Sequence, residues 1–432
     1  MAEQIMKLKK APAYRFIPFI LVCYAYMCIY VGNNLVQQAA VQLREWFSIS
    51  DTQLSVLSSA TILFFGVFEF VGSFLVPKIG AKKVCMAGMA VLAISGILFF
   101  LKPESYGVMV AIRLFQGIGA GFMSCCVMSL AVVWFPRKQR SIASGVMACS
   151  YGLANIMLTN ASTSMYAAGQ GWNQVFFIFL TIMNAIGLLL FLFIYVDIEK
   201  KYGVINIDEI IEGSEYDDTA EVKTYTNDKF KPYDSWGVML KSASFWTFMI
   251  PIFLYCWNVY ALSFVMPLLL TEKGFSPAES ATIQSLVFLG AIIGSPLGGI
   301  ISDKIFGGRR ATISGIAFLG SALFLLVFPY VIDSGNRNLF FLSLWPLASY
   351  LVMHFAAGPQ WVMPSELCTP KFSMCLMGLS LIVTKIGGII GPVLAGWFSD
   401  TTGTIMGGIW SIVIVSIIAG IANFVLAKKW GL

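Results

Sequence analysis

Twelve long apolar windows constrain the fold of this chain more strongly than any other feature. The windows fall near residues 16–40, 52–76, 84–101, 105–132, 141–165 and 174–196, and again near 244–270, 279–302, 310–332, 338–363, 374–399 and 404–427. A helix of about 20 apolar residues crosses the hydrocarbon core of a bilayer, which is about 30 Å thick. Backbone groups in lipid must form their hydrogen bonds within the segment, so each window is predicted to be helical. We therefore predict an all-α membrane protein with twelve transmembrane helices.

Composition and charge support this fold class. Charged residues make up 12% of the chain and hydrophobic residues 58%, whereas a soluble domain carries about 25% charged residues. The net charge of +6 is modest. Its basic residues fall on predicted loops, so we expect no nucleic-acid partner.

The distribution of lysine and arginine predicts how the chain is oriented. With both termini in the cytoplasm, 22 of the 28 basic residues lie on the cytoplasmic side and 4 on the other. The remaining two, Arg113 and Lys385, lie within predicted helices. Basic residues gather on the cytoplasmic side of membrane proteins. We expect a multi-pass protein of the cytoplasmic (inner) membrane with both termini inside.

A polar stretch from Asp197 to Lys241 divides the windows into six and six. It holds 11 of the 22 acidic residues and has little apolar periodicity. We predict an N-terminal six-helix bundle over 1–196, a C-terminal one over 244–432, and between them a cytoplasmic linker over 197–243. The linker is expected to be flexible, with one short surface helix.

The two predicted bundles contain similar sequence segments at matching places. The first contains GSFLVPKIGAKK at 72–83 and WFPRKQRSIASG at 134–145. The second contains, at matching places, GGIISDKIFGGRR at 298–310 and LCTPKFSMCLMG at 367–378. Two related halves around a site at the membrane midplane are typical of secondary transporters.

These segments resemble the major facilitator superfamily. GGIISDKIFGGRR is similar to the loop signature of that family, and RLFQGIGAG at 113–121 is similar to its helix 4 signature. The resemblance implies two pseudo-symmetric six-helix bundles, alternating access, and a cavity lined by helices 1, 4, 7 and 10. It also implies a gating role for Asp303, as the cap of a helix on the cytoplasmic side, with Arg309 and Arg310 beside it.

Two subgroups of the superfamily are similar to this chain. VWFPRKQRSIASGVMACSYGLA at 133–154 resembles both the oxalate/formate antiporters and the anion:cation symporters. TKIGGIIG at 384–391 resembles the antiporters, whose helix 11 carries a substrate-binding lysine, and that role maps onto Lys385. Those antiporters also carry an arginine on helix 8. GAIIGSPLGG at 290–299 has none, so the resemblance does not extend to a doubly charged substrate.

Lys385 is the strongest candidate for a binding residue. An ammonium group at this depth costs several kcal/mol unless a partner or a wet cavity compensates it. We interpret Lys385 as the counter-charge of a substrate anion. The alternative is an internal contact with Glu69 or with a helix carbonyl.

Three other titratable residues in the windows have two readings each. Arg113 either binds the anion or anchors helix 1 through carbonyl hydrogen bonds. Glu69, as a buried carboxyl group, can hold a proton at neutral pH and couple it to transport, or it can pair with a basic residue. His354, the one histidine, either couples protons and contacts substrate or packs as a satisfied core residue.

Polar and aromatic residues complete the predicted lining. Asn33 and Gln37 share a face of helix 1 because they are four residues apart. Helix 7 contributes a cluster and helix 10 one tryptophan, although aromatic residues can also simply pack or mark the membrane interface. These further candidates are Tyr255, Trp257, Asn258, Tyr260 and Trp361.

We therefore hypothesise a secondary active transporter for a small organic anion, with a monocarboxylate favoured. Arg113 and Lys385 outnumber Glu69 inside the windows, and surplus positive charge attracts anions. Transport would be driven by proton symport through Glu69 or His354, or by exchange of anions. The aromatic residues of helix 7 suggest a substrate with an apolar portion. We expect a monomer in the bilayer.

Other functional classes have less support. No GxxxxGK[ST] loop is present, so direct ATP drive is not expected. No catalytic Ser/His/Asp or HExxH pattern is present, and the nine cysteines lack metal-type spacing, so we expect neither an enzyme nor a cofactor. Two alternatives stay open: an exporter of amphipathic drugs, and a nutrient sensor that does not transport.

Overall fold

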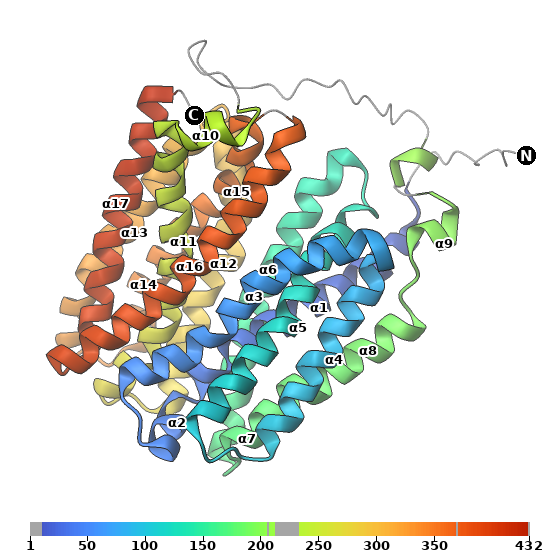
Figure 1. The fold of residues 1–432 in the computed structure, drawn as a ribbon. Helices are drawn as coiled ribbons and strands as arrows, with labels where there is room; N and C mark the ends of the chain where they lie inside the picture. The colour runs from blue at the N-terminus through green and yellow to red at the C-terminus, as the bar shows by residue number, and fades with distance from the viewer. Residues whose placement is uncertain (1–10, 205–206, 212–232, 369, 431–432) are drawn as a thin grey trace, which may run out of the picture.

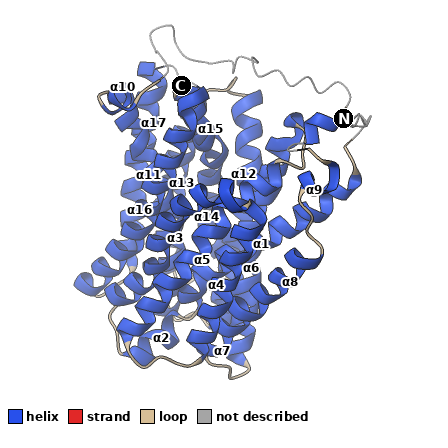
Figure 2. Ribbon diagram, turned by 45° about the vertical axis from the view of Figure 1, so that its right-hand side comes forward, coloured by secondary structure: helices blue, strands red, loops and turns tan. Residues whose placement is uncertain are grey.

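The computed structural model describes residues 11–204, 207–211, 233–368 and 370–430. Within these ranges the chain is a bundle of helices joined by short loops (Figure 2). Blue-to-green helices (α1 to α8) form one half and yellow-green-to-red helices (α11 to α17) the other, and the two halves lie side by side (Figure 1). The all-α fold class is confirmed.

The first half contains the first six predicted helices. Its elements are η1 (Ala13–Arg15), α1 (Phe16–Gln38), α2 (Ala40–Phe47), α3 (Asp51–Ile79), α4 (Ala81–Phe100), α5 (Tyr106–Val132), α6 (Arg137–Ala167), α7 (Trp172–Phe176), η2 (Phe177–Ile182) and α8 (Met183–Phe193). The last three form one continuous span with a π-helical turn in its middle. The short helix α2 has no counterpart in the predicted windows, because eight residues are too few to produce an apolar one.

The second half contains the other six. Its elements are α11 (Ala243–Glu272), α12 (Pro277–Lys304), α13 (Arg310–Asp333), α14 (Leu339–Met353), η4 (His354–Ala356), α15 (Ala357–Leu367), α16 (Pro370–Thr402) and α17 (Met406–Trp430). The tenth predicted helix is thus broken at His354 into α14 and α15.

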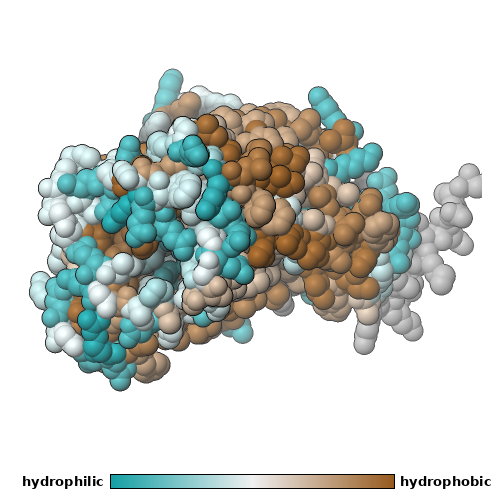
Figure 3. Space-filling model, turned by 90° about the horizontal axis from the view of Figure 1, so that it is seen from below, coloured by the Kyte–Doolittle hydropathy of each residue, from teal (hydrophilic) through white to brown (hydrophobic). Residues whose placement is uncertain are grey.

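Eleven helical segments of the described chain are long and apolar enough to cross a membrane. The remaining predicted span, α6, is helical over 31 residues, and several side chains of its first turns lie outside the described residues. It packs between α1 and α12, so protein covers much of its surface in place of lipid. On the outside of the bundle, apolar side chains such as Ile20, Phe74, Leu189 and Phe193 are exposed. Figure 3 shows such side chains gathered in a broad hydrophobic region beside a hydrophilic one.

The linker differs from the expectation of one short helix. Its described parts contain three: α9 (Ile198–Tyr202), η3 (Ile207–Ile210) and α10 (Trp236–Leu240). Residues 212–232, where flexibility was predicted, lie outside the described residues. The division at 197 and 243 stays a prediction.

The described contacts between the halves differ along the length of the bundle. We call the end that carries α2 and α7 the distal end, and the opposite end, near α10, the proximal end (Figure 1). Toward the distal end, Asn160 of α6 donates to Ser285 of α12 at 2.7 Å, and an added Cβ at Gly152 would clash with α12. Farther toward the proximal end, a Cβ built on Gly145 of α6 or on Gly299 of α12 would have no described atom of another helix within 4 Å. At these two glycines no contact between α6 and α12 is described.

Candidate functional site

Lys385 and Glu69 form an ion pair across the boundary between the halves. Lys385 lies in the middle of α16, and its Nζ is 3.5 Å from Oε2 of Glu69 on α3. The ammonium also lies 3.5 Å from the centre of the Phe65 ring, a cation–π contact. Both charged side chains are largely buried, with 12% and 11% of their surface exposed. The internal pairing that the sequence left open for Lys385 is therefore present.

The pair is loose. Hydrogen bonds from nitrogen to oxygen usually span 2.7–3.2 Å, and Oε2 of Glu69 accepts none from the described residues. The other oxygen, Oε1, accepts a hydrogen bond of 2.6 Å from Ser124 of α5. The carboxylate is thus positioned by Ser124, while the ammonium donors of Lys385 remain available to a third group.

Small residues let the helices approach closely enough for this pairing. A Cβ added at Gly66 would lie 3.0 Å from the Lys385 side chain. One added at Gly121 of α5 would lie 2.6 Å from the backbone nitrogen of Glu69. The glycines of the RLFQGIGAG segment therefore bring α5 and its Ser124 against α3.

Arg113 is fully buried and anchors the first half. Its guanidinium group has five N–H donors, and all five are in use. They go to the carbonyl oxygens of Leu57 (3.2 Å), Gly32 (3.0 Å), Asn33 (3.2 Å) and Ser58 (3.1 Å) and to Oε1 of Gln116 (2.7 Å). This is the anchoring alternative, and no donor is left for a substrate. Carbonyl dipoles of α1 and α3 already solvate this cation. Arg113 therefore adds less to the attraction for a substrate anion than the sequence predicted.

Tyrosines from both halves contact one another at the boundary between the halves. Tyr26 donates to Tyr30 at 3.3 Å on α1, and the Tyr30 ring lies 4.8 Å from that of Tyr151 on α6. The hydroxyl groups of Tyr151 and Tyr350 of α14 are 2.9 Å apart. The sequence interpretation missed Tyr26 and Tyr30, although their spacing of four residues places them on one face of helix 1.

His354 sits at the break between α14 and α15, among these tyrosines. Its Nδ1 lies 2.8 Å from the carbonyl oxygen of Tyr350. A carbonyl can only accept, so Nδ1 carries the proton. Its ring lies 4.4 Å from that of Tyr350 and 6.2 Å from that of Tyr255. No contact in the described structure joins His354 to Lys385 or Glu69, so the packing alternative accounts for what is seen.

The remaining helix 1 candidates are buried and incompletely bonded. Asn33 is 1% exposed, and neither polar atom of its side chain has a partner among the described residues. The Oε1 atom of Gln37 is likewise unpaired in the described structure. Polar atoms that are buried without a partner are costly, so both residues are suited to bind a polar ligand.

The helix 7 and helix 10 candidates occupy different surroundings. Trp257 is buried, with its Nε1 unpaired among the described residues, and the Tyr260 ring packs on Gly388 of α16. Asn258 instead donates to Ser416 of α17 at 2.9 Å, inside the second half and away from the boundary. Trp361 is half-buried, and no described contact links it to the ion pair.

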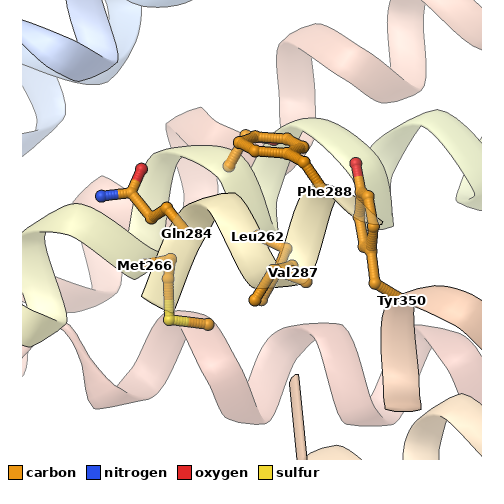
Figure 4. Close-up of a pocket in the computed structure, with 7 residues that line it drawn as sticks. Leu262, Met266, Gln284, Val287, Phe288 and Tyr350 are labelled. Carbon is orange, nitrogen blue, oxygen red and sulfur yellow. The ribbon is translucent and has the colours of Figure 1, made fainter. Parts of the chain in front are cut away.

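A small hollow adjoins the tyrosines, between α11, α12 and α14. Its lining residues are Leu262, Ser263, Met266, Gln284, Val287, Phe288 and Tyr350. Figure 4 shows the Gln284 amide and the Tyr350 hydroxyl on the same side of the hollow, with Met266 and Val287 on the other. Gln38 of α1 donates to Gln284 at 3.3 Å, so this mostly apolar hollow also lies where the halves meet.

Comparison with known proteins identifies the family. The family model described as Major Facilitator Superfamily matches residues 22–373. The chain belongs to this superfamily. It is therefore a multi-pass membrane transporter and not an enzyme.

Relatives within the superfamily are distant but cover most of the chain. A probable sulfoacetate transporter of Cupriavidus necator is 22% identical, over 89% of this chain and 87% of its own. A hexuronate transporter of Bacillus subtilis is 21% identical, over 90% of each. The solved structure of a bacterial homologue of the human lysosomal transporter Spinster, inward-facing and occupied, has a TM-score of 0.69 at 15% identity, covering 97% of this chain and 98% of that one. The superfamily fold that the sequence predicted is confirmed.

Asp303, for which the resemblance implied a gating role, contacts the next helix of its own half. Asp303, at the end of α12, forms an ion pair with Arg310 at the start of α13 in the same half, and Arg310 also donates to Ser302 at 2.9 Å. The N-cap residue of α13 is Arg309. Its side chain is exposed and forms no capping hydrogen bond with the first turn of that helix. The described contacts of Asp303 are therefore made within its own half.

Proposed function

We propose that this superfamily member carries a small organic monoanion together with one proton, by alternating access between its halves. The observation that carries the proposal is the loose Lys385–Glu69 pair on two helices from different halves. We further propose that it works as a monomer in the inner membrane with both termini cytoplasmic. The proximal ends of α6 and α12 would then face the cytoplasm.

The charge balance of the site supports this coupling. Lys385 and Glu69 neutralise each other when the carrier is empty. An anion bound to Lys385 would leave one uncompensated negative charge in a dry interior, which costs several kcal/mol. A proton on Glu69 removes that charge and releases the ammonium to the anion. Empty and loaded carriers are then both neutral, and each monoanion brings one proton.

The chemistry of Lys385 supports the substrate class. An ammonium group binds an anion as a point charge, which fits one carboxylate or another singly charged head group. A dianion would need a second cation, and Arg113 has no donor to give. The names of the relatives, which include sulfoacetate and hexuronate transporters, support an organic anion, and we favour a monocarboxylate.

The rest of the substrate would meet the tyrosines and the hollow. Tyr26, Tyr30 and Asn33 offer hydrogen bonds, and the walls around Phe288 are apolar. Proton uptake is assigned to Glu69 over His354, because Glu69 contacts Lys385 directly.

The direct test uses purified protein. A thermal-shift screen against carboxylates, sulfonates, phosphate esters and neutral solutes should select a monoanion, since a ligand at 100 times its Kd stabilises the folded protein by about 2.7 kcal/mol. Uptake of that anion into proteoliposomes is then compared for Lys385→Ala, Lys385→Arg and the exposed control Lys304→Ala. We expect loss of binding and uptake for Lys385→Ala, partial uptake for Lys385→Arg and full uptake for the control. Full uptake by Lys385→Ala would refute the assignment.

A further inference from the structure

Asp400 of the second half caps a helix of the first half. It lies near the end of α16, at the distal end of the bundle. Its Oδ1 accepts from the backbone nitrogen of Asp51 at 2.9 Å, and its Oδ2 accepts from the backbone nitrogen of Thr52 at 2.9 Å. The Thr52 hydroxyl donates to the same Oδ2 at 2.5 Å. Asp51 and Thr52 are the first two residues of α3.

The chemistry of a helix start explains why a carboxylate sits there. The first N–H groups of a helix have no partner within it, and they carry a partial positive charge. Ser50 of the same half bonds the backbone nitrogen of Gln53. The two donors before it are bonded by Asp400, which belongs to the other half.

Neighbouring contacts hold the same two helices together. Ser399 donates to Oδ2 of Asp51 at 2.6 Å, and Arg44 of α2 pairs with that carboxylate. A Cβ added at Gly396 would lie 2.6 Å from the carbonyl oxygen of Asp51. Every bond from α16 to the start of α3 must break if these helices separate.

Glu272 provides an internal comparison. Its carboxylate accepts from the backbone nitrogen of Ile405 at 2.9 Å and from the Thr404 hydroxyl at 2.5 Å, just before α17. The chemistry matches that of Asp400. The bonds of Glu272 join two helices of the same half, however, so they persist when the halves move apart as bodies.

We propose that Asp400 is a latch that keeps the distal end closed, and that release of its bonds to α3 is a step in opening that end. The proposal does not depend on the substrate or on proton coupling. These bonds favour the closed form, because opening exposes two backbone N–H donors of α3 and the carboxylate of Asp400, which bond each other only in that form.

The test measures access to Ser59, which lies on α3 farther into the bundle. Ser59 is 2% exposed and donates to the carbonyl oxygen of Ile389 on α16, so a Ser59→Cys thiol reacts when α3 and α16 separate. We would measure its alkylation by N-ethylmaleimide in solubilised protein, reading the peptide that contains position 59 by mass spectrometry. Asp400→Ala should raise this rate by about fivefold, the effect of one helix cap on a two-state equilibrium.

Three further variants make the result decisive. Asp400→Asn keeps an acceptor oxygen, so the thiol at position 59 should stay mostly protected from alkylation. Thr52→Val removes one hydroxyl donor only, so it should raise the alkylation rate less than Asp400→Ala does. Glu272→Ala should lower the melting temperature without raising the rate. Equal rates in Asp400→Ala and Glu272→Ala, or an unchanged rate in both Asp400→Ala and Thr52→Val, would overturn the latch.

Discussion

Lys385 and Glu69 meet across the boundary of the two halves, with 3.5 Å between the ammonium nitrogen and the nearer carboxylate oxygen. Ser124 binds the other oxygen from within the first half, so the acid is fixed to its own half while the lysine belongs to the other. A relative movement of the halves must change this distance. The electrostatics of the site and the conformation of the carrier are therefore linked at one contact.

Glu69→Gln is expected to separate binding from proton coupling. The amide mimics the protonated acid, so Lys385 stays free for the anion and the affinity should be kept or increased. Uptake driven by a pH gradient should fall at least about tenfold, since a loss of 1.4 kcal/mol of coupling already has that effect, while exchange of labelled for unlabelled anion continues. Both rates are measurable in the same proteoliposomes.

Ser124→Ala is the matched control for this variant. It removes the hydrogen bond to Glu69 but leaves the titratable acid in place, so accumulation should persist. Unimpaired pH-driven accumulation in Glu69→Gln would instead assign the carrier to anion exchange.

The pair should also show a stability coupling. Replacing one member of a buried ion pair costs about 3–5 kcal/mol, whereas replacing both with neutral groups is often close to neutral. Lys385→Met can be relieved by protonation of Glu69, so we expect Glu69→Gln, which leaves the cation alone, to lower the melting temperature more. The double variant should melt above Glu69→Gln. Additive losses in a thermal-unfolding assay would show that the two groups do not interact.

The twelve helices were predictable because bilayer thickness sets their lengths. Every predicted window became a helical span with ends a few residues away. The exceptions have local causes, since α2 is too short to form a window and the break at His354 leaves hydrophobicity unchanged. The polar residues of the site were harder to assign. A residue that faces lipid and one that faces a neighbouring helix are both surrounded by apolar groups. The hydrophobic periodicity of a membrane helix is therefore weak, and it does not reveal which face of the helix points inward.

The charges illustrate this limit. Counting Arg113 as a free cation predicted a positive cavity, but its donors are bonded to carbonyl oxygens that only a fold can bring together. Lys385 was assigned correctly to the interior, with Glu69 among its possible partners. The choice between that acid and a helix carbonyl depends on how α3 and α16 are rotated. Ser124 and Tyr26 were missed for the same reason.

Arg113→Lys is expected to damage folding far more than substrate affinity. Lysine has three donors where arginine has five, so at least two buried acceptors lose their bonds, at about 1–3 kcal/mol each. The melting temperature and the yield of folded protein should fall sharply. In the folded fraction, the Kd for the anion should change by less than about twofold. A large rise in Kd with unchanged stability would place Arg113 in the binding site after all.

The paired glycines of α6 offer a test of closure at the proximal end. Gly152 already contacts α12, and its added Cβ would come 3.0 Å from the carbonyl oxygen of Phe288. Gly152→Ala should therefore cost about 1–3 kcal/mol through overpacking. Gly145→Ala meets open space among the described residues, so its stability should stay within about 0.5 kcal/mol of the parent or rise.

A larger side chain at Gly145 tests whether α6 and α12 come into contact there during transport. Gly145→Leu should leave the melting temperature nearly unchanged, because a Cβ at that position would have no described atom of another helix within 4 Å. If α6 and α12 come together at the proximal end during each cycle, the leucine will obstruct the contact and slow net uptake while anion binding persists. Uptake at the parental rate by this folded variant would show that these two helices do not close against each other at Gly145.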